Sequence, residues 1–259
     1  MRILTFWVMF SFLNHVNAQS APSIAEFELK LGSHQALPLS DKIAFELSNS
    51  NAKAIMKNLQ NWPDIKTTLL DSDRLLINMK QRPQYAGNVS SSYLQNSFVI
   101  DISEKSTIEF TSGLKINKHQ PIKLEQLEAY VDQYIDKPTY VNGFHIASIV
   151  ATQRSGDCTE YAVLLTALAR SLDLPARVII GTVIVEQKDK VSAFGHAWVE
   201  VWHDKKWQIM DAALHQSKAL KHFYLPSTEL EKEGPGYNMS LVKSIVLLPN
   251  KISELQDAN

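Results

Sequence analysis

The chain has 259 residues, of which 45% are hydrophobic and 20% charged, and its formal net charge is −1. These fractions are typical of an ordinary globular protein with room for one large domain or two small ones. No basic run is present, so the composition gives no sign of a nucleic-acid partner. The single cysteine excludes an internal disulfide and also a zinc site built from several cysteines.

The first residues have the pattern of a secretory signal peptide. A positive start at Met1-Arg2 precedes an apolar stretch over residues 3–13, and small residues follow at Val16-Asn17-Ala18. The apolar stretch is shorter than a membrane-spanning helix requires, and no later stretch of the sequence is long and apolar enough to span. We therefore expect residues 1–18 to be removed from a secreted or periplasmic protein. The alternative is an uncleaved N-terminal anchor.

Residues 19–118 are predicted to form a β-rich N-terminal domain. Residues 81–96 contain proline, glycine and serine and are expected to be a loop. No cluster of catalytic residue types is found in this half, so its expected role is structural or in substrate docking. The expected strands cover 26–31, 42–47, 67–70, 74–79, 98–102 and 107–111, and a short helix is expected over 52–59.

Residues 119–249 are predicted to form a second domain, in which helices precede strands. Apolar residues recur at helical spacing over 124–135, and a shorter helical segment is expected over 144–152. A third helix should begin at residue 158 and end just before Pro175. The strands expected after it cover 177–185, 196–203, 206–210 and 241–248. Residues 250–259 are polar and are expected to be a frayed tail.

The segment Gly156-Asp157-Cys158-Thr159-Glu160 contains the only cysteine, at the predicted start of a helix. Asp157 is a good N-cap, and Glu160 three residues later completes a capping box. The positive end of the helix dipole favours the thiolate form of a first-turn cysteine, whereas the two nearby carboxylates oppose it. A reactive thiol here therefore needs a partner base. Taken alone, a lone cysteine is more often a small, buried and inert hydrophobe.

His196 and Asp211 are the candidates for that base and for the group that orients it. His196 begins a predicted strand, and Asp211 ends the strand that returns after a tight turn at residues 204–205. Pairing residue 202 with residue 205 would set His196 and Asp211 close to opposite each other. Thiol acyl transfer needs a nucleophile, a base within hydrogen-bond reach and a group that orients the base. The sequence thus predicts a triad of Cys158, His196 and Asp211.

The remaining candidate residue types are expected to be structural. His203 lies at the hairpin turn and His215 lies past the strand, so neither combines strand placement with a facing acid. No His-Glu-x-x-His pattern and no calcium-loop pattern is present, so no metal or cofactor is expected. Trp198, Trp202 and Trp207 are expected to pack in the core or in strand pairs.

Four blocks of sequence resemble the transglutaminase-like (transglutaminase core) superfamily, a branch of the papain-like cysteine enzymes. They are SGDCTEYA at 155–162, LARSLDLPARV at 168–178, GHAWVEV at 195–201 and WQIMD at 207–211. The resemblance implies a papain-like α+β fold, in which the helix bearing Cys158 packs on an antiparallel sheet. It also implies Cys158, His196 and Asp211 as the catalytic triad. Asp173 stands where the family usually has glycine, at a helix end that a left-handed aspartate can tolerate.

The activity implied by the resemblance is that of a cysteine hydrolase or acyltransferase acting on protein or peptide amide bonds. A thioester would form on Cys158, and water or an amine would then release it, giving a protease, an amidase or a transglutaminase. Cell-wall peptides are one variant of the substrate. The main-chain N–H of Cys158 is the favoured oxyanion donor and Gln153 a weaker one. The alternative is a catalytically inactive binding or scaffold protein with the same fold, in which residues 19–118 are the interaction module.

Overall fold

The structure is a computed structural model that describes residues 25–116, 121–139, 144–230 and 233–258. The predicted signal peptide over 1–18 lies outside these residues. No helix in the described ranges has the length and apolar character needed to cross a membrane. In chain order the elements are β1 Ala25–Leu31, β2 Lys42–Ser48, α1 Ala52–Leu59, β3 Lys66–Leu69, β4 Arg74–Lys80, the 3-10 helix η1 Ser91–Leu94, α2 Lys105–Gly113, α3 Leu124–Tyr134, β5 Lys137–Pro138, α4 Ala147–Gln153, β6 Ser155–Gly156, α5 Cys158–Ser171, β7 Ala176–Glu186, β8 Val191–His203, β9 Lys206–Met210, β10 Lys221–Glu229, α6 Asn238–Leu247 and β11 Lys251–Asp257.

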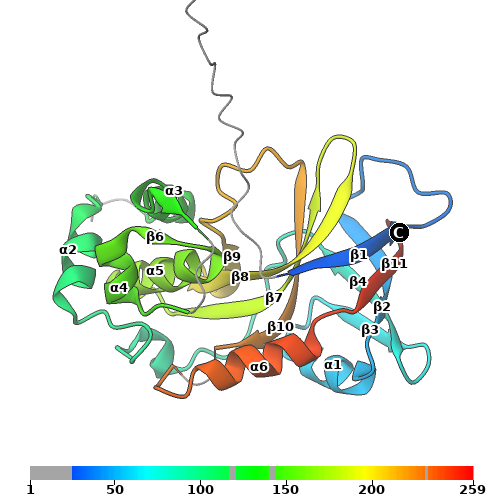
Figure 1. The fold of residues 1–259 in the computed structure, drawn as a ribbon, viewed down its shortest axis with the longest axis horizontal. Helices are drawn as coiled ribbons and strands as arrows, with labels where there is room; N and C mark the ends of the chain where they lie inside the picture. Colours follow the sequence, from blue (N-terminus) through cyan, green and yellow to red (C-terminus); the bar gives the residue numbers. More distant parts are fainter. Residues whose placement is uncertain (1–24, 117–120, 140–143, 231–232, 259) are drawn as a thin grey trace, which may run out of the picture.

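Nine of the described strands form one curled sheet in the order β10-β7-β8-β1-β11-β2-β4-β3, with β9 also paired to β8. All the pairs in this sheet are antiparallel except β1 with β11. Figure 1 shows the strands of the first hundred residues at one end and β7, β8 and β10 towards the other. The fold is thus α+β with a mostly antiparallel sheet, as expected. One sheet contains strands from before and after residue 118. The predicted division into two domains at this residue therefore stays a prediction.

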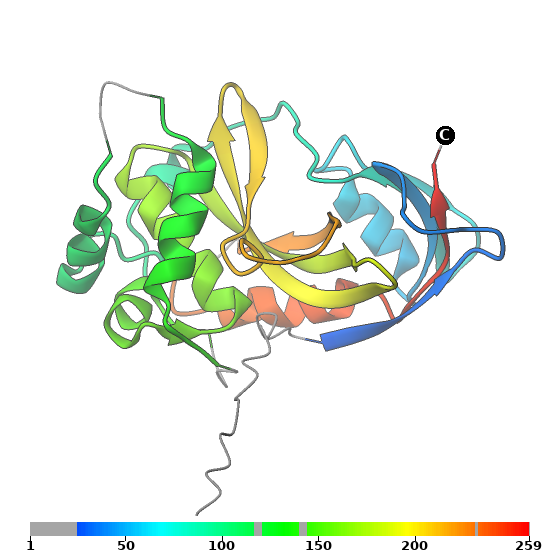
Figure 2. The same cartoon turned by 90° about the horizontal axis from the view of Figure 1, so that it is seen from above.

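The Cys158 helix, α5, is buried on almost every side. Its sequence is apolar around most of its circumference, which is typical of a helix enclosed by other elements. One face contacts β7 and β8, and α2, α3 and α4 contact the rest. Figure 2 shows these helices grouped together, away from α1 and the N-terminal strands. Asp173 ends the helix region with a φ of 58°, the left-handed conformation expected at this position.

Strands β7 and β8 carry a hydrophobic core on each face. Val178 and Ile180 pack with the α5 helix, whereas Ile179 and Val183 pack with the core beneath β2, β4 and α1. Burial on both faces explains why residues 177–185 are an almost continuous apolar run rather than an alternating one. The three expected strands 177–185, 196–203 and 206–210 are therefore confirmed, with β8 starting earlier than predicted, at Val191.

The strands predicted over 98–102 and 107–111 are wrong. Residues 105–113 form helix α2, which contacts α4 and α5. Thr107 and Phe110 are buried at helical spacing, while Ile108 between them is 48% exposed. The threonine and isoleucine content favoured a strand locally, but burial of Phe110 against neighbouring helices determines the conformation.

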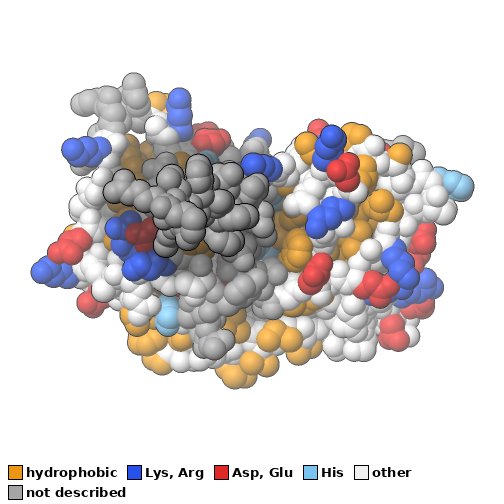
Figure 3. All heavy atoms as spheres, turned by 45° about the horizontal axis from the view of Figure 1, so that its top comes forward, with side chains coloured by type: hydrophobic (Ala, Val, Ile, Leu, Met, Phe, Trp, Pro, Cys, Tyr) orange, Lys and Arg blue, Asp and Glu red, His pale blue; other side chains and the backbone are white. Residues whose placement is uncertain are grey.

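The C-terminal predictions are also wrong. Residues 241–248 were expected as a strand and belong instead to helix α6, and the expected frayed tail contains strand β11. Helix α6 buries Ser240 and Ser244, four residues apart, and contacts β10 and β7. Several of its apolar residues are exposed, although Leu247 is buried, so the apolar run resembled a buried strand. The exposed ones are Met239, Val242, Ile245 and Val246. Apolar side chains are visible along the lower edge of Figure 3, the edge at which α6 lies in Figure 1.

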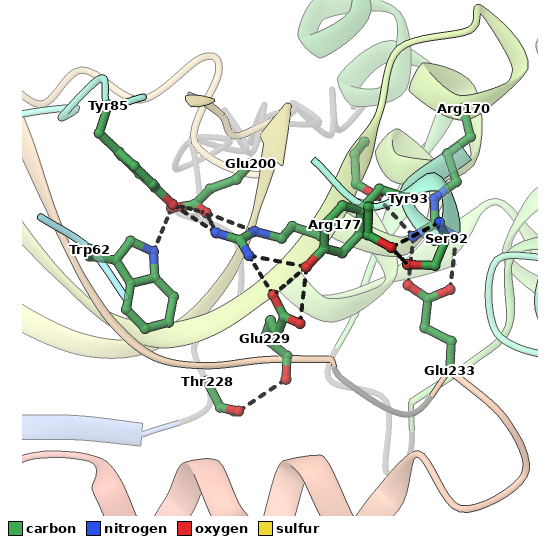
Figure 4. A network of polar contacts seen from close by, with 12 residues as sticks. Trp62, Tyr85, Ser92, Tyr93, Arg170, Arg177, Glu200, Thr228, Glu229 and Glu233 are labelled. Carbon is green, nitrogen blue, oxygen red and sulfur yellow. Dashed lines mark hydrogen bonds and ion pairs between the residues drawn. The ribbon is translucent and has the colours of Figure 1, made fainter. Parts of the chain in front are cut away.

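A polar network joins the first half of the chain to the sheet (Figure 4). Arg177 on β7 forms ion pairs with Glu200 at 2.8 Å and with Glu229 at 2.5 Å. Its guanidinium also lies 4.5 Å from the centre of the Trp207 ring. Tyr85, from the loop after β4, donates its hydroxyl to Glu200 at 2.7 Å. The loop over residues 81–96 is therefore fixed to the sheet through a partly buried arginine that is paired with two acids.

Candidate active site

Cys158 is the first residue of α5, and the predicted capping box is present. The Asp157 carboxylate accepts the N–H of Thr159 at 2.9 Å, and the Glu160 carboxylate accepts the N–H of Asp157 at 3.0 Å. Gly156 is required before the cap, because a Cβ atom there would lie 2.2 Å from the Cβ of Glu160. The sequence motif thus positions the thiol at the N-terminal end of the helix dipole.

The Cys158 side chain is completely buried in this conformation, with 0% exposure. Burial raises the pKa of the Cys158 thiol, because it disfavours the charged thiolate. The positive charge of His196 and a hydrogen bond to it are the main opposing influences, and the charge of Asp157 adds to the increase. His196 is therefore the largest influence that favours the Cys158 thiolate, and it does not outweigh the burial of the thiol.

His196 and Asp211 are in direct contact. The Nε2 atom of His196 lies 2.9 Å from Oδ2 of Asp211, and both side chains are buried. The predicted strand register is wrong by two residues: Trp202 pairs with Trp207, and His203 pairs with Lys206. Asp204 and Lys205 form the turn between them, both with positive φ. A shift of two residues keeps the same faces of the strands together, so the acid still reaches His196.

The pKa values of this pair move in opposite directions. Burial disfavours the imidazolium of His196, but the charges of Asp211 and Cys158 and hydrogen bonds to both outweigh it and raise its pKa to about 10. Burial likewise disfavours the Asp211 carboxylate, but His196, the Tyr224 hydroxyl and the charge of Arg82 outweigh it and lower the pKa of Asp211. An ionised aspartate beside a protonated imidazole is therefore the favoured state of the pair.

His196 lies at an interruption in the pairing of β8. On the edge of β8 opposite β7, strand β1 pairs with residues up to Gly195, and β9 pairs from Val199 onward. The start of α5 approaches this part of the sheet, since the Cys158 thiol interacts with His196 and with the main chain of Ala197. Cys158 at the start of α5, His196 on β8 and Asp211 directly after β9 thus lie close together.

The sequence match to known proteins concerns this same region. Residues 110–212 match the model of the transglutaminase-like superfamily. These residues are a transglutaminase-like core. A comparison with curated proteins found no significant match.

Three solved structures that are similar to this chain are described by their sequence identity, coverage and TM-score. A candidate cysteine protease from Cytophaga hutchinsonii is 13% identical, with 76% of this chain and 77% of that chain covered and a TM-score of 0.37. The periplasmic domain of TgpA from Pseudomonas aeruginosa, bound to ethylmercury, is 14% identical, with 76% and 84% covered and a TM-score of 0.42. Red sea bream transglutaminase is 10% identical, with 72% and 49% covered and a TM-score of 0.32.

The other candidates from the sequence lie apart from the three predicted catalytic residues. Gln153, the weaker oxyanion candidate, lines a surface hollow between α2 and α4. His203 pairs with Asp204 at 3.3 Å at the hairpin turn, and the Nδ1 atom of His215 lies 3.8 Å from Glu128. Among the described residues, no group of three or more histidines, cysteines or acids is arranged to hold a metal ion.

The sequence missed two residues that hydrogen-bond to Asp211. Tyr224 on β10 donates its hydroxyl to Oδ2 of Asp211 at 2.9 Å, and Glu128 on α3 accepts the Asp211 N–H at 2.7 Å. Glu128 could have been noticed as an acid between Leu127 and Val131, on the side of α3 that is buried. The strand that contains Tyr224 was not predicted.

A third buried acid, Glu160, gives the folded core a specific pH dependence. Burial and the charge of Asp157 raise the pKa of Glu160 to about 7, although N–H groups of His145 and Asp157 oppose the increase. The folded state thus binds this proton more tightly than the unfolded state. Its contribution to stability is complete below about pH 4.5 and is lost as the pH rises through about 7, a decrease of at most about 3 kcal/mol.

We therefore expect Glu160→Gln to remove a negative slope of stability against pH. Glutamine preserves the capping box and cannot ionise. Urea unfolding of the wild type should give a lower free energy at pH 7.5 than at pH 5 by up to about 3 kcal/mol from this group, and the variant should lack that difference. Glu109→Gln, at an acid whose side chain is 67% exposed, is the control and should keep the wild-type slope. An unchanged slope in Glu160→Gln would contradict the assignment.

Proposed function

We propose that this chain is a cysteine hydrolase or acyltransferase that acts on protein or peptide amide bonds through a thioester on Cys158. The observation that carries the proposal is the 2.9 Å contact between His196 Nε2 and Asp211 Oδ2 beside a first-turn cysteine in a transglutaminase-like core. A nucleophile, a base and a group that orients the base are the parts that thiol acyl transfer requires.

The geometry supports a definite role for each residue. Because Nε2 of His196 is engaged by Asp211, Nδ1 is the nitrogen available to take the proton of the Cys158 thiol. The resulting thiolate attacks the amide carbonyl, and His196 returns the proton to the departing amine. Asp211 stabilises the imidazolium between these steps. Water or a second amine then releases the acyl group from the thioester.

The favoured donor to the developing oxyanion is the main-chain N–H of Cys158. It lies in the first turn of α5, where N–H groups have no intrahelical acceptor. A donor of this kind, already oriented, stabilises charge that develops in the transition state. The position of Gln153 beside α2 makes it the weaker of the two expected donors.

The proposal places the protein outside the cytoplasm, either secreted or periplasmic. The support is the signal-peptide pattern of residues 1–18, with its positive start, apolar stretch and small residues at the cleavage positions. A single cysteine in an oxidising compartment cannot form an internal disulfide, and its presence there fits a chemical role. The proposed organisation is a β-rich domain over 19–118 followed by the core over 119–249.

A catalytically inactive binding or scaffold protein is the second candidate. The observation that favours it is the complete burial of Cys158, since a thiol that no substrate reaches cannot react. In that case residues 19–118 would supply the interaction surface. The two candidates differ in whether an acyl group can be transferred to Cys158.

The test is to detect that acyl group. Incubation with glutamine-containing peptides and peptide esters, followed by acid quenching and intact mass measurement, should show an adduct on Cys158 of the wild type. Asp211→Asn should fold but form the adduct about 10²-fold or more slowly, because the imidazolium and its orientation lose their support. Thermal unfolding of the variant confirms folding. No adduct with any peptide, together with a thiol that is alkylated only on unfolding, would support the scaffold instead.

A further inference from the structure

We propose that Tyr224 is a positioning residue of the candidate active site and acts through Asp211. The inference rests on the proposed function and extends it to a residue that the four sequence blocks do not include. Tyr224 is on β10 and is completely buried. Its hydroxyl donates to Oδ2 of Asp211 at 2.9 Å, the same oxygen that contacts His196 at 2.9 Å.

Besides His196 and Tyr224 on Oδ2, one further hydrogen bond from the described part of the chain reaches the Asp211 carboxylate. Its Oδ1 accepts the N–H of Leu214 at 3.2 Å, and its own N–H donates to Glu128 at 2.7 Å. The Leu214 contact is long, whereas the Tyr224 contact is short and involves the oxygen that faces the imidazole. The tyrosine hydroxyl is therefore the group that fixes the orientation of Oδ2 toward His196.

The position of Tyr224 depends on a glycine in the neighbouring strand. Gly181 on β7 pairs with His196 on β8. A Cβ at Gly181 would lie 2.2 Å from the Leu225 carbonyl oxygen and 2.7 Å from the Trp198 ring. The absence of a side chain leaves room for the Trp198 ring, whose centroid lies 6.5 Å from that of His196 and 5.2 Å from that of Tyr224. The three rings thus pack as one group on one face of the sheet.

The proton on this hydrogen bond belongs to the tyrosine. Burial and the charge of Asp211 raise the pKa of Tyr224 well above its ordinary value, so the phenol stays protonated and donates. An ionised carboxylate can only accept, which matches the lowered pKa of Asp211. Other titratable or charged groups interact with Asp211 or Tyr224 from the surrounding elements. These are Arg82 after β4, Glu128 on α3, His196 on β8 and His222 on β10.

The test compares Tyr224→Phe with the wild type by two measurements. Loss of the donor should raise the midpoint of the Asp211 carboxyl titration by about one pH unit. Carbon NMR of labelled aspartate measures this midpoint. The acid limb of Cys158 alkylation by iodoacetamide should move up in parallel, and the rate at neutral pH should fall about 10-fold. Tyr130→Phe is the matched control, because it removes a hydroxyl that donates to the Phe110 carbonyl at 2.6 Å, and neither curve should move.

The two measurements separate this inference from the proposed function. If wild-type Cys158 titrates as an ordinary thiol and His196→Ala does not change it, the proposed function fails, and the carboxyl titration still decides the role of Tyr224. If the wild-type thiol is activated, and the Asp211 titration and Cys158 alkylation curves of Tyr224→Phe coincide with those of the wild type, the inference is overturned. If Tyr224→Phe does not fold, 3-fluorotyrosine at position 224 replaces it. That more acidic donor should move the Asp211 midpoint down, and an unmoved midpoint would overturn the inference as well.

Discussion

His196→Ala should slow acylation of Cys158 by a peptide amide by about 10²–10⁴-fold, the usual contribution of a general acid–base residue. The structural reason is that the thiol is completely buried and its pKa is raised by that burial, with His196 as the main opposing influence. Without the imidazole, nothing takes the thiol proton or protonates the departing amine. Acylation is followed by intact mass after rapid acid quenching.

The role of His196 can also be tested without a substrate, by the pH dependence of Cys158 alkylation. Alkylation of Cys158 by iodoacetamide should shift to higher pH in His196→Ala, because the cation that favours the thiolate has been removed. His203→Ala is the control: it lies on the same strand and also contacts an acid, Asp204 at 3.3 Å, but at the hairpin turn. Equal alkylation curves for wild type and His196→Ala would remove His196 from the mechanism.

Arg177→Met should lower the free energy of unfolding by about 3–5 kcal/mol, the usual cost of removing one partner from a buried ion pair. Glu200, whose side chain is 3% exposed, would lose its partner cation, and so would Glu229. Methionine keeps most of the side-chain volume over Trp207, so the loss is mainly electrostatic. Urea unfolding at pH 7 measures it.

Two further variants test that explanation for Arg177. Arg74→Met removes an arginine that is also paired with two acids, Glu46 and Asp71, but at the surface, and should lower the free energy of unfolding far less than Arg177→Met does. Adding Glu200→Gln to Arg177→Met should restore part of the lost stability by removing the unpaired charge. If the two arginine variants lose the same stability, the network of Figure 4 does not behave as a buried ion pair.

The sequence predicted the candidate site better than the fold around it. The Asp157–Glu160 capping box is a local pattern, so it could be recognised and placed Cys158 correctly. The contact between His196 and Asp211 was also predicted, although from a register that is wrong by two residues. That error was harmless because a shift of two residues keeps side chains on the same face of a strand.

The elements that could not be predicted are those whose conformation depends on distant neighbours. Helix α2 forms where its composition favours a strand, and α6 buries two serines while four of its apolar side chains are exposed. Strand β10 contains Pro226, which weakens a strand pattern, and it is tolerated because β10 is at the edge of the sheet. Tyr224 was missed for this reason, since no pattern placed it beside Asp211.

The parallel pairing of β1 with β11 has a consequence for how the chain can fold. Strand β11 lies between β1 and β2, so a strand synthesised after all the other described strands completes the middle of the sheet. The contacts of β11 with β1 and β2 join residues more than two hundred positions apart. These contacts must form before β2, β3 and β4 become part of the same sheet as β8, the strand that carries His196. Such non-local pairing is slow to form, because the entropy of closing the long loop is lost before the contacts compensate for it. During synthesis the helical half can collapse around α5 first, while the edge of β1 stays open until the C-terminal strand leaves the ribosome.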